Sequence, residues 1–337
     1  MNLFEPAGAP PVTASVVICV YTEKRWDDIV GAVESVAAQD VRPVETIVVV
    51  DHNPALLDRA REAFAPAGVQ VVPNAHKQGL SGARNTAVEL AEGEVVVFLD
   101  DDAAARPGWL RALLEPYADP AVAGVGGVAH PRFPADRPVT LPGDAPADRD
   151  ATGELDWVVG CTYTGQPTAQ AEVRNLMGCN MSLRAEVFKR VGGFAEDIGR
   201  IGKNPLGCEE TELCIRARQA YKADGRTIKI LFEPRAVVDH RVSADRVEWA
   251  YLRRRSWAEG LSKAAVSKLV GSDDALSTER GYVATVLPKA VLREVRARRP
   301  VAAAAVVVCL GFTTAGYVRG KLPGATAHVS LPAANGA

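Results

Sequence analysis

The sequence predicts an α/β protein with a mostly parallel sheet and helices on both faces of that sheet. Through the first hundred residues, short β-branched runs of strand length alternate with stretches whose apolar residues recur at helical spacing. Parallel strands need such helical connections, because the chain must return to the starting edge before the next strand begins. A chain of 337 residues, 47% of them hydrophobic, can also bury the large core that this fold requires.

The expected elements follow one another along the chain. Strands are predicted at 15–20, 46–50, 69–72 and 95–99. Helices are predicted after these strands, at 55–64 and 81–91, from Pro107, and from Asp27 or Asp28 as the cap of the first helix. A further helix is expected at 185–191, where Gly192 ends it.

Between about residues 130 and 174, frequent proline and glycine residues predict irregular loops or short strands. Long loops in a compact protein usually serve a function, and disorder is the alternative interpretation. We therefore expect two parts, an α/β domain over 12–245 and a helical C-terminal extension over 246–325.

Three consecutive carboxylates, Asp100, Asp101 and Asp102, directly follow the apolar run at 95–99. Adjacent carboxylates repel one another unless a cation neutralises them. Hard divalent cations such as Mg²⁺ and Mn²⁺ bind carboxylate oxygens, often together with the phosphates of a substrate. The triplet therefore indicates a metal–diphosphate site, with a solvated turn as the alternative.

Polar groups also follow two other predicted strands, because Tyr21 and Glu23 come after the first and Asp51 after the second. In a parallel sheet these strand ends meet at one edge, which is where ligands bind in this architecture. Three strands that deliver acidic or polar groups to one edge favour a binding site. No glycine-rich dinucleotide loop or P-loop follows the first strand, so a dehydrogenase or P-loop enzyme is poorly supported.

The composition argues against several classes of protein. A net charge of −2 and few aromatic residues make a nucleic-acid binder a poor fit. The six cysteines include no Cys-x-x-Cys pair, which argues against a zinc cage or a disulfide framework and fits a reducing cytoplasm. The first residues show no basic and apolar signal sequence, so a cytoplasmic protein is expected.

One C-terminal segment complicates the cytoplasmic interpretation. Residues 301–318 carry no charge and are bracketed by basic residues, among them Arg299 and Arg319. This length is at the lower limit for crossing a bilayer, and many alanine residues weaken the apolar drive. A membrane span and a buried or interfacial helix are both open. The flanking basic residues could face anionic headgroups at the inner face of the cell membrane.

A series of short motifs runs through about two thirds of the chain in a fixed order. They lie at 15–22, 45–51, 79–85, 98–102, 178–181, 191–194 and 208–213. Each motif is weak alone, but their order and spacing together resemble family 2 of the glycosyltransferases. The resemblance implies a GT-A fold, a Rossmann-like α/β sheet, and inverting sugar transfer from a nucleotide sugar.

The resemblance also implies a role for each matching position. The nucleotide would be held by Tyr21, Glu23, Asp51, Arg84 and Asp100, a metal ion (Mn²⁺ or Mg²⁺) by Asp102 and His240, and the donor sugar or acceptor by Asp101, Gly178 and Asn180. Catalysis would fall to Glu210, with Glu209 beside it.

One motif departs from the family pattern. The family's Glu-Asp-x-Asp reads Glu209-Glu210-Thr211-Glu212 here, so the base would be a glutamate. The extra methylene moves the carboxylate by about an ångström, a distance to which reaction geometry is sensitive. Which of Glu209 and Glu210 acts as the base stays open. Acids in the first turn of a helix also complement the helix dipole, so a purely structural role for these glutamates is the alternative to catalysis.

The expected activity is therefore inverting transfer of a sugar from a nucleoside diphosphate sugar. UDP-sugar is favoured as donor, and GDP- and dTDP-sugars are open. The acceptor would be a hydroxyl or phosphate, and the C-terminal segment favours a polyprenyl phosphate or a cell-surface glycan over a soluble small molecule. The alternatives are a sugar-nucleotide nucleotidyltransferase and a catalytically silent, transferase-like binding subunit.

Overall fold

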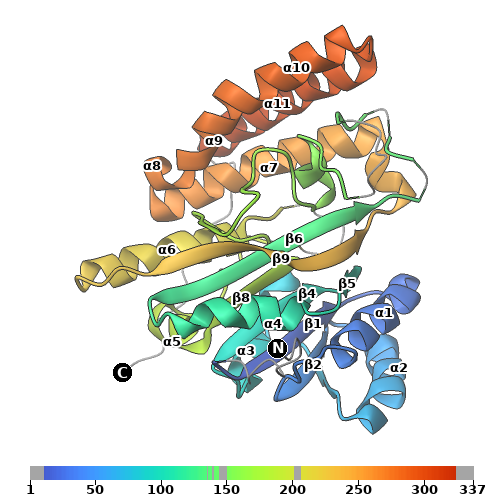
Figure 1. The fold of residues 1–337 in the computed structure, drawn as a ribbon, viewed down its shortest axis with the longest axis vertical. Coiled ribbons are helices and arrows are strands. Elements are labelled where there is room, and N and C mark those ends of the chain that lie inside the picture. The colour runs from blue at the N-terminus through green and yellow to red at the C-terminus, as the bar shows by residue number, and fades with distance from the viewer. Residues whose placement is uncertain (1–10, 135, 139, 144–149, 201–205, 324–337) are drawn as a thin grey trace, which may run out of the picture.

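A computed structural model of the protein describes residues 11–323, except 135, 139, 144–149 and 201–205. Its centre is one sheet with the strand order β3-β2-β1-β4-β8-β6-β9-β5, and β7 pairs with β9 (Figure 1). The strands are β1 Ala14–Val20, β2 Glu45–Val50, β3 Gln70–Pro73, β4 Val95–Asp100, β5 Ala103–Ala105, β6 Val122–Arg132, β7 Ala171–Glu172, β8 Asn180–Arg184 and β9 Lys229–Arg241.

Helices cover the sheet and continue beyond it. They are α1 Trp26–Ala37, α2 Pro54–Phe64, α3 Leu80–Leu90, α4 Trp109–Leu114, α5 Ala185–Val191, α6 Glu209–Ala223, α7 Trp249–Val270, α8 Ser272–Ala275, α9 Ser277–Gly281, α10 Leu287–Arg296 and α11 Pro300–Lys321. The predicted α/β class is confirmed. The predicted helices at 55–64, 81–91 and 185–191 agree with α2, α3 and α5 to within one residue at each end.

The sheet is parallel in its first half and mixed in its second half. Strands β3, β2, β1 and β4 are parallel, as the alternating pattern predicts. Strand β8 runs antiparallel to both β4 and β6. The described residues between β6 and β8 contain no α-helix, only short turns and β7. A parallel return needs a long crossover, so a chain without a crossover helix runs back antiparallel.

Two apolar cores lie on opposite faces of the sheet. In β1, Val16 and Ile18 face the core shared with α1, α2 and α4, whereas Val17 faces the core shared with α3, α5 and α6. This alternation has the two-residue period of a strand buried on both faces.

The predicted cap of the first helix is wrong. Asp27 and Asp28 do not cap α1 but lie in its first turn, where acids still complement the helix dipole.

The C-terminal helices form a separate layer that packs on Leu141 and on residues 155–161 through an apolar cluster (Figure 1). Helices α7 and α11 approach very closely. A Cβ atom at Gly260 of α7 would overlap the backbone of α11 at Thr313, and one at Gly316 would overlap the backbone of Trp257. Strand β9 ends at Arg241 and α7 begins at Trp249, so we keep the division at residue 246 as a proposal.

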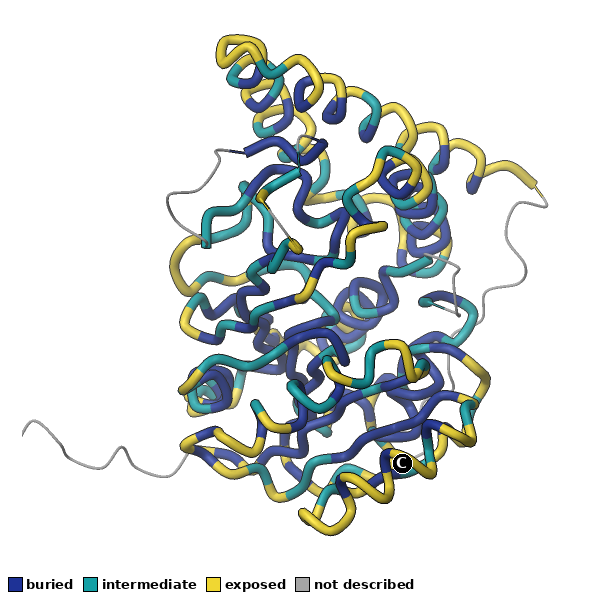
Figure 2. Tube along the Cα trace, turned by 90° about the vertical axis from the view of Figure 1, so that its right-hand side faces the viewer, coloured by how far each residue is buried: buried dark blue, intermediate teal, exposed yellow. Residues whose placement is uncertain are grey.

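Within the described residues, α11 is the one helix long and apolar enough to cross a membrane by length and composition. Only 33% of its most apolar stretch is buried. Figure 2 shows many exposed residues along the outer helices. The exposed large apolar side chains of this layer are Val283, Leu292, Val295, Val301, Val307, Phe312, Val318 and Leu322.

Candidate active site

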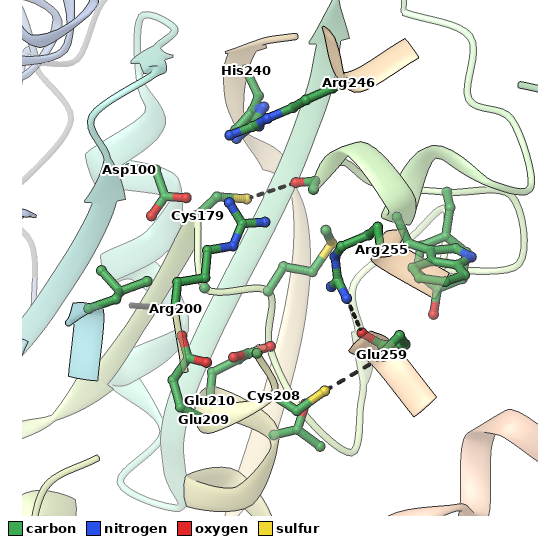
Figure 3. Close-up of a pocket in the computed structure, with 18 of the residues that line it drawn as sticks. Asp100, Cys179, Arg200, Cys208, Glu209, Glu210, His240, Arg246, Arg255 and Glu259 are labelled. Carbon is green, nitrogen blue, oxygen red and sulfur yellow. Dashed lines mark hydrogen bonds and ion pairs between the residues drawn. The ribbon is translucent and has the colours of Figure 1, made fainter. Parts of the chain in front are cut away.

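A cavity of about 1180 Å³ lies between the carboxyl edge of the sheet and the C-terminal helices. Its sheet side is lined by the ends of β1, β2 and β4, by the turn before β8 and by the start of α6. Its other side is lined by α7 and by residues of α9 to α11. Figure 3 shows acidic and cationic side chains from both sides pointing into this cavity.

The end of β4 brings the predicted metal site together. Asp102 is 6% exposed, and its Oδ1 lies 3.2 Å from Nε2 of His240. Its Oδ2 lies 3.0 Å from Nη1 of Arg25 and 3.4 Å from Nη2 of Arg246. Burial favours the protonated acid, but His240 and Arg25 nevertheless hold the pKa of Asp102 well below its usual range. The carboxylate is therefore ionised, as a metal ligand must be.

Strand pairing explains why His240 reaches the triplet. Ala103 of β5 is the register partner of His240 in β9, and the backbone N–H of Arg241 donates to the carbonyl oxygen of Asp102 at 2.8 Å. One ligand atom each from Asp100, Asp102 and His240 lie within 4.8 Å of one another. Two carboxylate oxygens and an imidazole nitrogen form a donor set suited to Mn²⁺ or Mg²⁺. Asp100, predicted to contact the nucleotide, thus joins the possible metal ligands.

The predicted nucleotide residue Arg84 links three parts of the site. It is buried on α3, and its Nη1 donates to Glu209 Oε1 at 2.8 Å. Its Nη2 donates to the carbonyl oxygen of Gly178 at 2.8 Å and lies 3.6 Å from Asp100 Oδ1. Gly178 must be small, since a Cβ atom there would come within 2.8 Å of Arg84. Arg84 therefore fixes Glu209 and Asp100 relative to each other.

The two predicted catalytic glutamates have different surroundings. Cys208 has φ +72°, and this left-handed residue starts α6 so that Glu209 and Glu210 lie in its first turn. Glu209 is 3% exposed and paired with Arg84. Glu210 lines the cavity, and burial together with the neighbouring Glu209 raises the pKa of Glu210 to about 8. Glu210 is thus the carboxyl group better placed to take a proton near neutral pH.

The remaining predicted nucleotide residues occupy different places. Asp51 lines the cavity at the end of β2 and accepts hydrogen bonds from Asn74 Nδ2 at 2.7 Å and from the backbone N–H of Gly79 at 3.0 Å. Tyr21 lines the cavity and is 42% exposed. Glu23 lies on a short turn at the surface and does not line the cavity.

The two further residues predicted to contact sugar also differ. Asp101 lines the cavity, its Oδ1 lies 2.7 Å from Arg25 Nη1, and burial raises its pKa to about 7. Asn180 is fully buried outside the cavity. It accepts from Trp109 Nε1 and donates to the carbonyl oxygens of Val128 and Ala236. The structure gives Asn180 a role in joining β8 to its neighbours, because all its polar groups are used there.

Sequence reasoning missed several cavity residues. Arg25 sits in the turn after β1, where the sequence offered a signal because that turn holds Tyr21 and Glu23. Arg246 and Arg255 come from the C-terminal part, and no motif marked them. Arg200 points into the cavity (Figure 3), and its side chain makes no hydrogen bond or ion pair with the described residues.

Comparison with known proteins was made for sequence and for structure. Residues 15–192 match the family model described as Glycosyl transferase family 2. The chain is 34% identical over 264 residues to a glucosyl-dolichyl phosphate glucuronosyltransferase of Haloferax volcanii, covering 77% of this chain and 80% of that protein. It is 27% identical over 214 residues to a pre-mycofactocin glycosyltransferase of Mycobacterium tuberculosis, covering 62% of this chain and 40% of the relative.

Two solved structures are similar in fold. The mannosyltransferase PcManGT from Pyrobaculum calidifontis, in complex with GDP-Man and Mn²⁺, superposes with a TM-score of 0.56 at 17% identity, over 94% of this chain and 90% of that one. GalNAc-T7 with UDP, GalNAc and Mn²⁺ superposes with a TM-score of 0.50 at 16% identity, over 86% of this chain and 58% of that one. At these identities the similarity shows the GT-A fold alone.

Proposed function

Because this chain belongs to glycosyl transferase family 2 and is a glycosyltransferase, we propose that it moves a sugar from a nucleoside diphosphate sugar to an acceptor hydroxyl with inversion. The observation that carries this proposal is one cavity lined by Asp100, His240 and the Glu209–Glu210 pair, with the carboxylate of Asp102 buried 3.2 Å from His240. A group that can hold a diphosphate and a group that can take a proton are the two parts that this reaction needs.

The donor would bind at the edge of the sheet. We propose that Asp100, Asp102 and His240 would hold Mn²⁺ or Mg²⁺, which supplies charge stabilisation for a departing diphosphate when bound. Asp51 and Tyr21 would contact the nucleotide. UDP-sugar is our proposed donor, and a GDP-sugar is the second candidate because one similar fold was solved with GDP-Man.

The acceptor would bind on the side of Glu210. In the proposed reaction the Glu210 carboxylate takes the proton from the acceptor hydroxyl while the oxygen attacks the anomeric carbon from the face opposite the diphosphate. One such displacement inverts the anomeric centre. Arg84 would position Glu209 rather than touch substrate, since its guanidinium is already engaged.

Family membership favours glycosyl transfer over nucleotidyl transfer. Product analysis with a labelled sugar nucleotide separates the two reactions. A glycosyltransferase releases a nucleoside diphosphate, whereas a nucleotidyltransferase running in reverse consumes pyrophosphate and releases a nucleoside triphosphate.

The nature of the acceptor bears on the location of the enzyme, because a lipid-linked acceptor resides in a membrane. A relative covering most of this chain is named for a dolichyl phosphate-linked substrate. Helix α11 is apolar, only 33% of its most apolar stretch is buried, and basic residues flank it. We therefore propose that the acceptor hydroxyl belongs to a sugar carried on a lipid phosphate, and that the enzyme is cytoplasmic and held at the inner face of the cell membrane. With one face packed tightly on α7, α11 would lie in the interface rather than cross it.

The donor proposal predicts a metal-dependent stabilisation. UDP is expected to raise the melting temperature of the protein when Mn²⁺ is present, and much less after chelation, because ligand that binds only the folded state stabilises it by mass action. Differential scanning fluorimetry with UDP, GDP and dTDP, each with and without Mn²⁺, measures this. Equal shifts with and without metal would contradict a metal–diphosphate site.

The membrane proposal predicts a specific effect on α11. Val307 and Val318 are 59% and 55% exposed and lie eleven residues apart, on one side of the helix. Val307→Glu is expected to weaken binding to vesicles of anionic phospholipid by about tenfold, because a buried apolar contact is replaced by a charge. Val44→Glu is the control, since Val44 is 54% exposed but lies before β2. Equal vesicle flotation of the two variants would contradict the proposal.

A further inference from the structure

The wall of the cavity formed by α7 carries a group of charged side chains that the proposed sugar transfer does not use. Arg255, Glu259 and Lys263 follow one another at four-residue spacing, so they share one face of α7. Arg174 reaches the same place from the segment before β8, and Glu279 reaches it from α9. All five residues line the cavity.

These side chains form a chain of ion pairs. Arg255 Nη1 lies 2.7 Å from Glu259 Oε2, and Lys263 Nζ lies 3.1 Å from Glu259 Oε1. Lys263 Nζ also lies 2.6 Å from Glu279 Oε1. Arg174 Nη1 lies 2.6 Å from Glu279 Oε2. Three cations therefore meet only two carboxylates, and the cluster carries a net positive charge.

The positive charge persists at neutral pH. Burial disfavours the charged form of Lys263, but Glu259 and Glu279 hold its pKa above the ordinary value. Burial likewise opposes ionisation of Glu259, but Lys263 and Arg255 lower its pKa to about 2. A cationic cluster removed from bulk water attracts an anion more strongly than the same charges would at the surface.

Arg255 has hydrogen-bonding capacity left over. Of its three nitrogen atoms, only Nη1 donates to a described residue, and its buried Nε has no partner. On α11, Thr313 lines the same cavity and adds a hydroxyl group to it. An unpaired buried Nε donor of Arg255 next to a net positive charge indicates a ligand with several acceptor oxygens.

The position of Arg255 relates it to Glu209, the neighbour of the proposed base Glu210. A Cβ atom at Gly207 would lie 3.9 Å from Arg255 Nη2 and 4.0 Å from Glu209 Oε2, so the two charged groups flank this glycine. Their separation cannot exceed the sum of these distances, so the cationic cluster lies beside the glutamate pair. In Figure 3 Arg255 lies with Glu259 on the α7 side, and the two glutamates lie on the other side of Cys208.

The cavity becomes apolar beyond the cluster. Ser256, the residue after Arg255, donates from its Oγ to Sγ of Cys309 on α11 at 3.2 Å. Leu287 and Leu310 line the cavity in this region, and they belong to the cluster of apolar residues that contains Cys309. Acidic, cationic and apolar surfaces thus follow one another, which matches a molecule with a sugar hydroxyl, a phosphate and a hydrocarbon chain.

We propose that Arg255, with Arg174 and Lys263, forms the binding site for the phosphate of an acceptor in which an isoprenoid phosphate carries the sugar that offers the hydroxyl. The hydrocarbon chain of this acceptor lies against α10 and α11. The inference rests on the proposed function, because the acceptor hydroxyl must reach Glu210. The charge excess and the unpaired Arg255 donors distinguish this site from a network that only holds the helices together.

The test uses the full chain and a short isoprenoid. Isothermal titration with farnesyl phosphate, farnesol and inorganic phosphate is carried out in the presence of UDP and Mn²⁺. The wild type is expected to bind farnesyl phosphate at least about tenfold more tightly than farnesol or inorganic phosphate. Arg255→Gln is expected to lose about tenfold in farnesyl phosphate affinity, and Arg255→Lys to recover part of it, while UDP affinity stays as in the wild type.

Arg296→Gln is the matched control, because Arg296 is an exposed arginine on α10 that does not line the cavity. Equal farnesyl phosphate affinity in Arg255→Gln and Arg296→Gln would overturn the site. So would equal binding of farnesyl phosphate and farnesol by the wild type, a comparison that decides the question even if Arg255→Gln does not fold. Absence of binding of UDP, GDP and dTDP alike in the wild type would instead contradict the proposed glycosyl transfer.

Discussion

Replacing Glu210 with glutamine is expected to lower the turnover number by about a hundredfold to ten-thousandfold, the usual contribution of a positioned general base. The amide has nearly the size of the carboxylate but cannot take a proton from the acceptor. UDP affinity should stay the same, because Glu210 lies at the start of α6 and not among the predicted nucleotide residues. Steady-state kinetics with a radiolabelled sugar nucleotide, together with titration of UDP, measure both quantities.

The pH dependence of the wild type provides an independent check. Burial and Glu209 raise the pKa of Glu210 to about 8, so the free enzyme holds this group protonated below that pH. The ratio kcat/KM should therefore fall as the pH drops below about 8, and this limb should be absent from the residual activity of Glu210→Gln. A flat profile between pH 6 and 9 in the wild type would contradict Glu210 as the base.

The same pKa shift has a consequence for stability with a definite sign. The folded state holds the proton of Glu210 up to about pH 8, whereas the unfolded chain releases it near the ordinary value of 4.5. The free energy of unfolding therefore falls as the pH rises from 4.5 to 8. Glu210→Gln removes this penalty, so it should melt at a higher temperature than the wild type above pH 8 and at the same temperature near pH 4. This comparison also shows that the inactive variant is folded.

Replacing Asp102 with asparagine is expected to lower turnover by at least about a hundredfold, since a bound metal ion contributes several kcal/mol of charge stabilisation. Asp102 offers one of the three candidate ligands, and asparagine removes its charge while keeping an amide oxygen for Arg25. The stabilisation of the protein by UDP should then no longer depend on Mn²⁺. Activity assays across Mn²⁺ concentrations and scanning fluorimetry measure the two effects.

Asp101→Asn is the matched comparison, because Asp101 is the adjacent carboxylate but offers no atom to the candidate metal group. Asp101→Asn should keep the metal dependence of the UDP-induced shift, whatever its effect on turnover. Full turnover in Asp102→Asn would show that this carboxylate does not serve the reaction. Full turnover in both Asp102→Asn and Glu210→Gln would remove the proposed site altogether.

The sequence predicted the sheet side of the site well because strand ends are local features. The β-branched run before Asp100 identifies β4, and a parallel sheet then brings Asp51 to the same edge. The family resemblance added His240, which lies 3.2 Å from Asp102. The resemblance also implied Glu23, Asp102 and Asn180, but none of them lines the cavity, since a position in the sequence does not fix the direction of a side chain.

The α7 side of the cavity could not be predicted from the sequence. Arg255 and Lys263 look like an ordinary charged helix face, and their enclosure depends on the packing of α7 against α11 and against residues 155–161. The pattern of apolar and polar residues in α7 does not indicate which face of this helix lines the cavity, because buried residues occur on several of its sides. The net charge and the burial of this cluster depend on contacts between residues that are far apart in the chain.

The contact between Gly260 and Gly316 places a shared constraint on two positions that touch no substrate. A side chain at either one would separate α7 from α11 and carry Arg255 away from the glutamates. Evolution can therefore enlarge one of these residues only where the opposing helix has already shifted. Natural variation at the two positions should be correlated among relatives, even though neither position takes part in the chemistry.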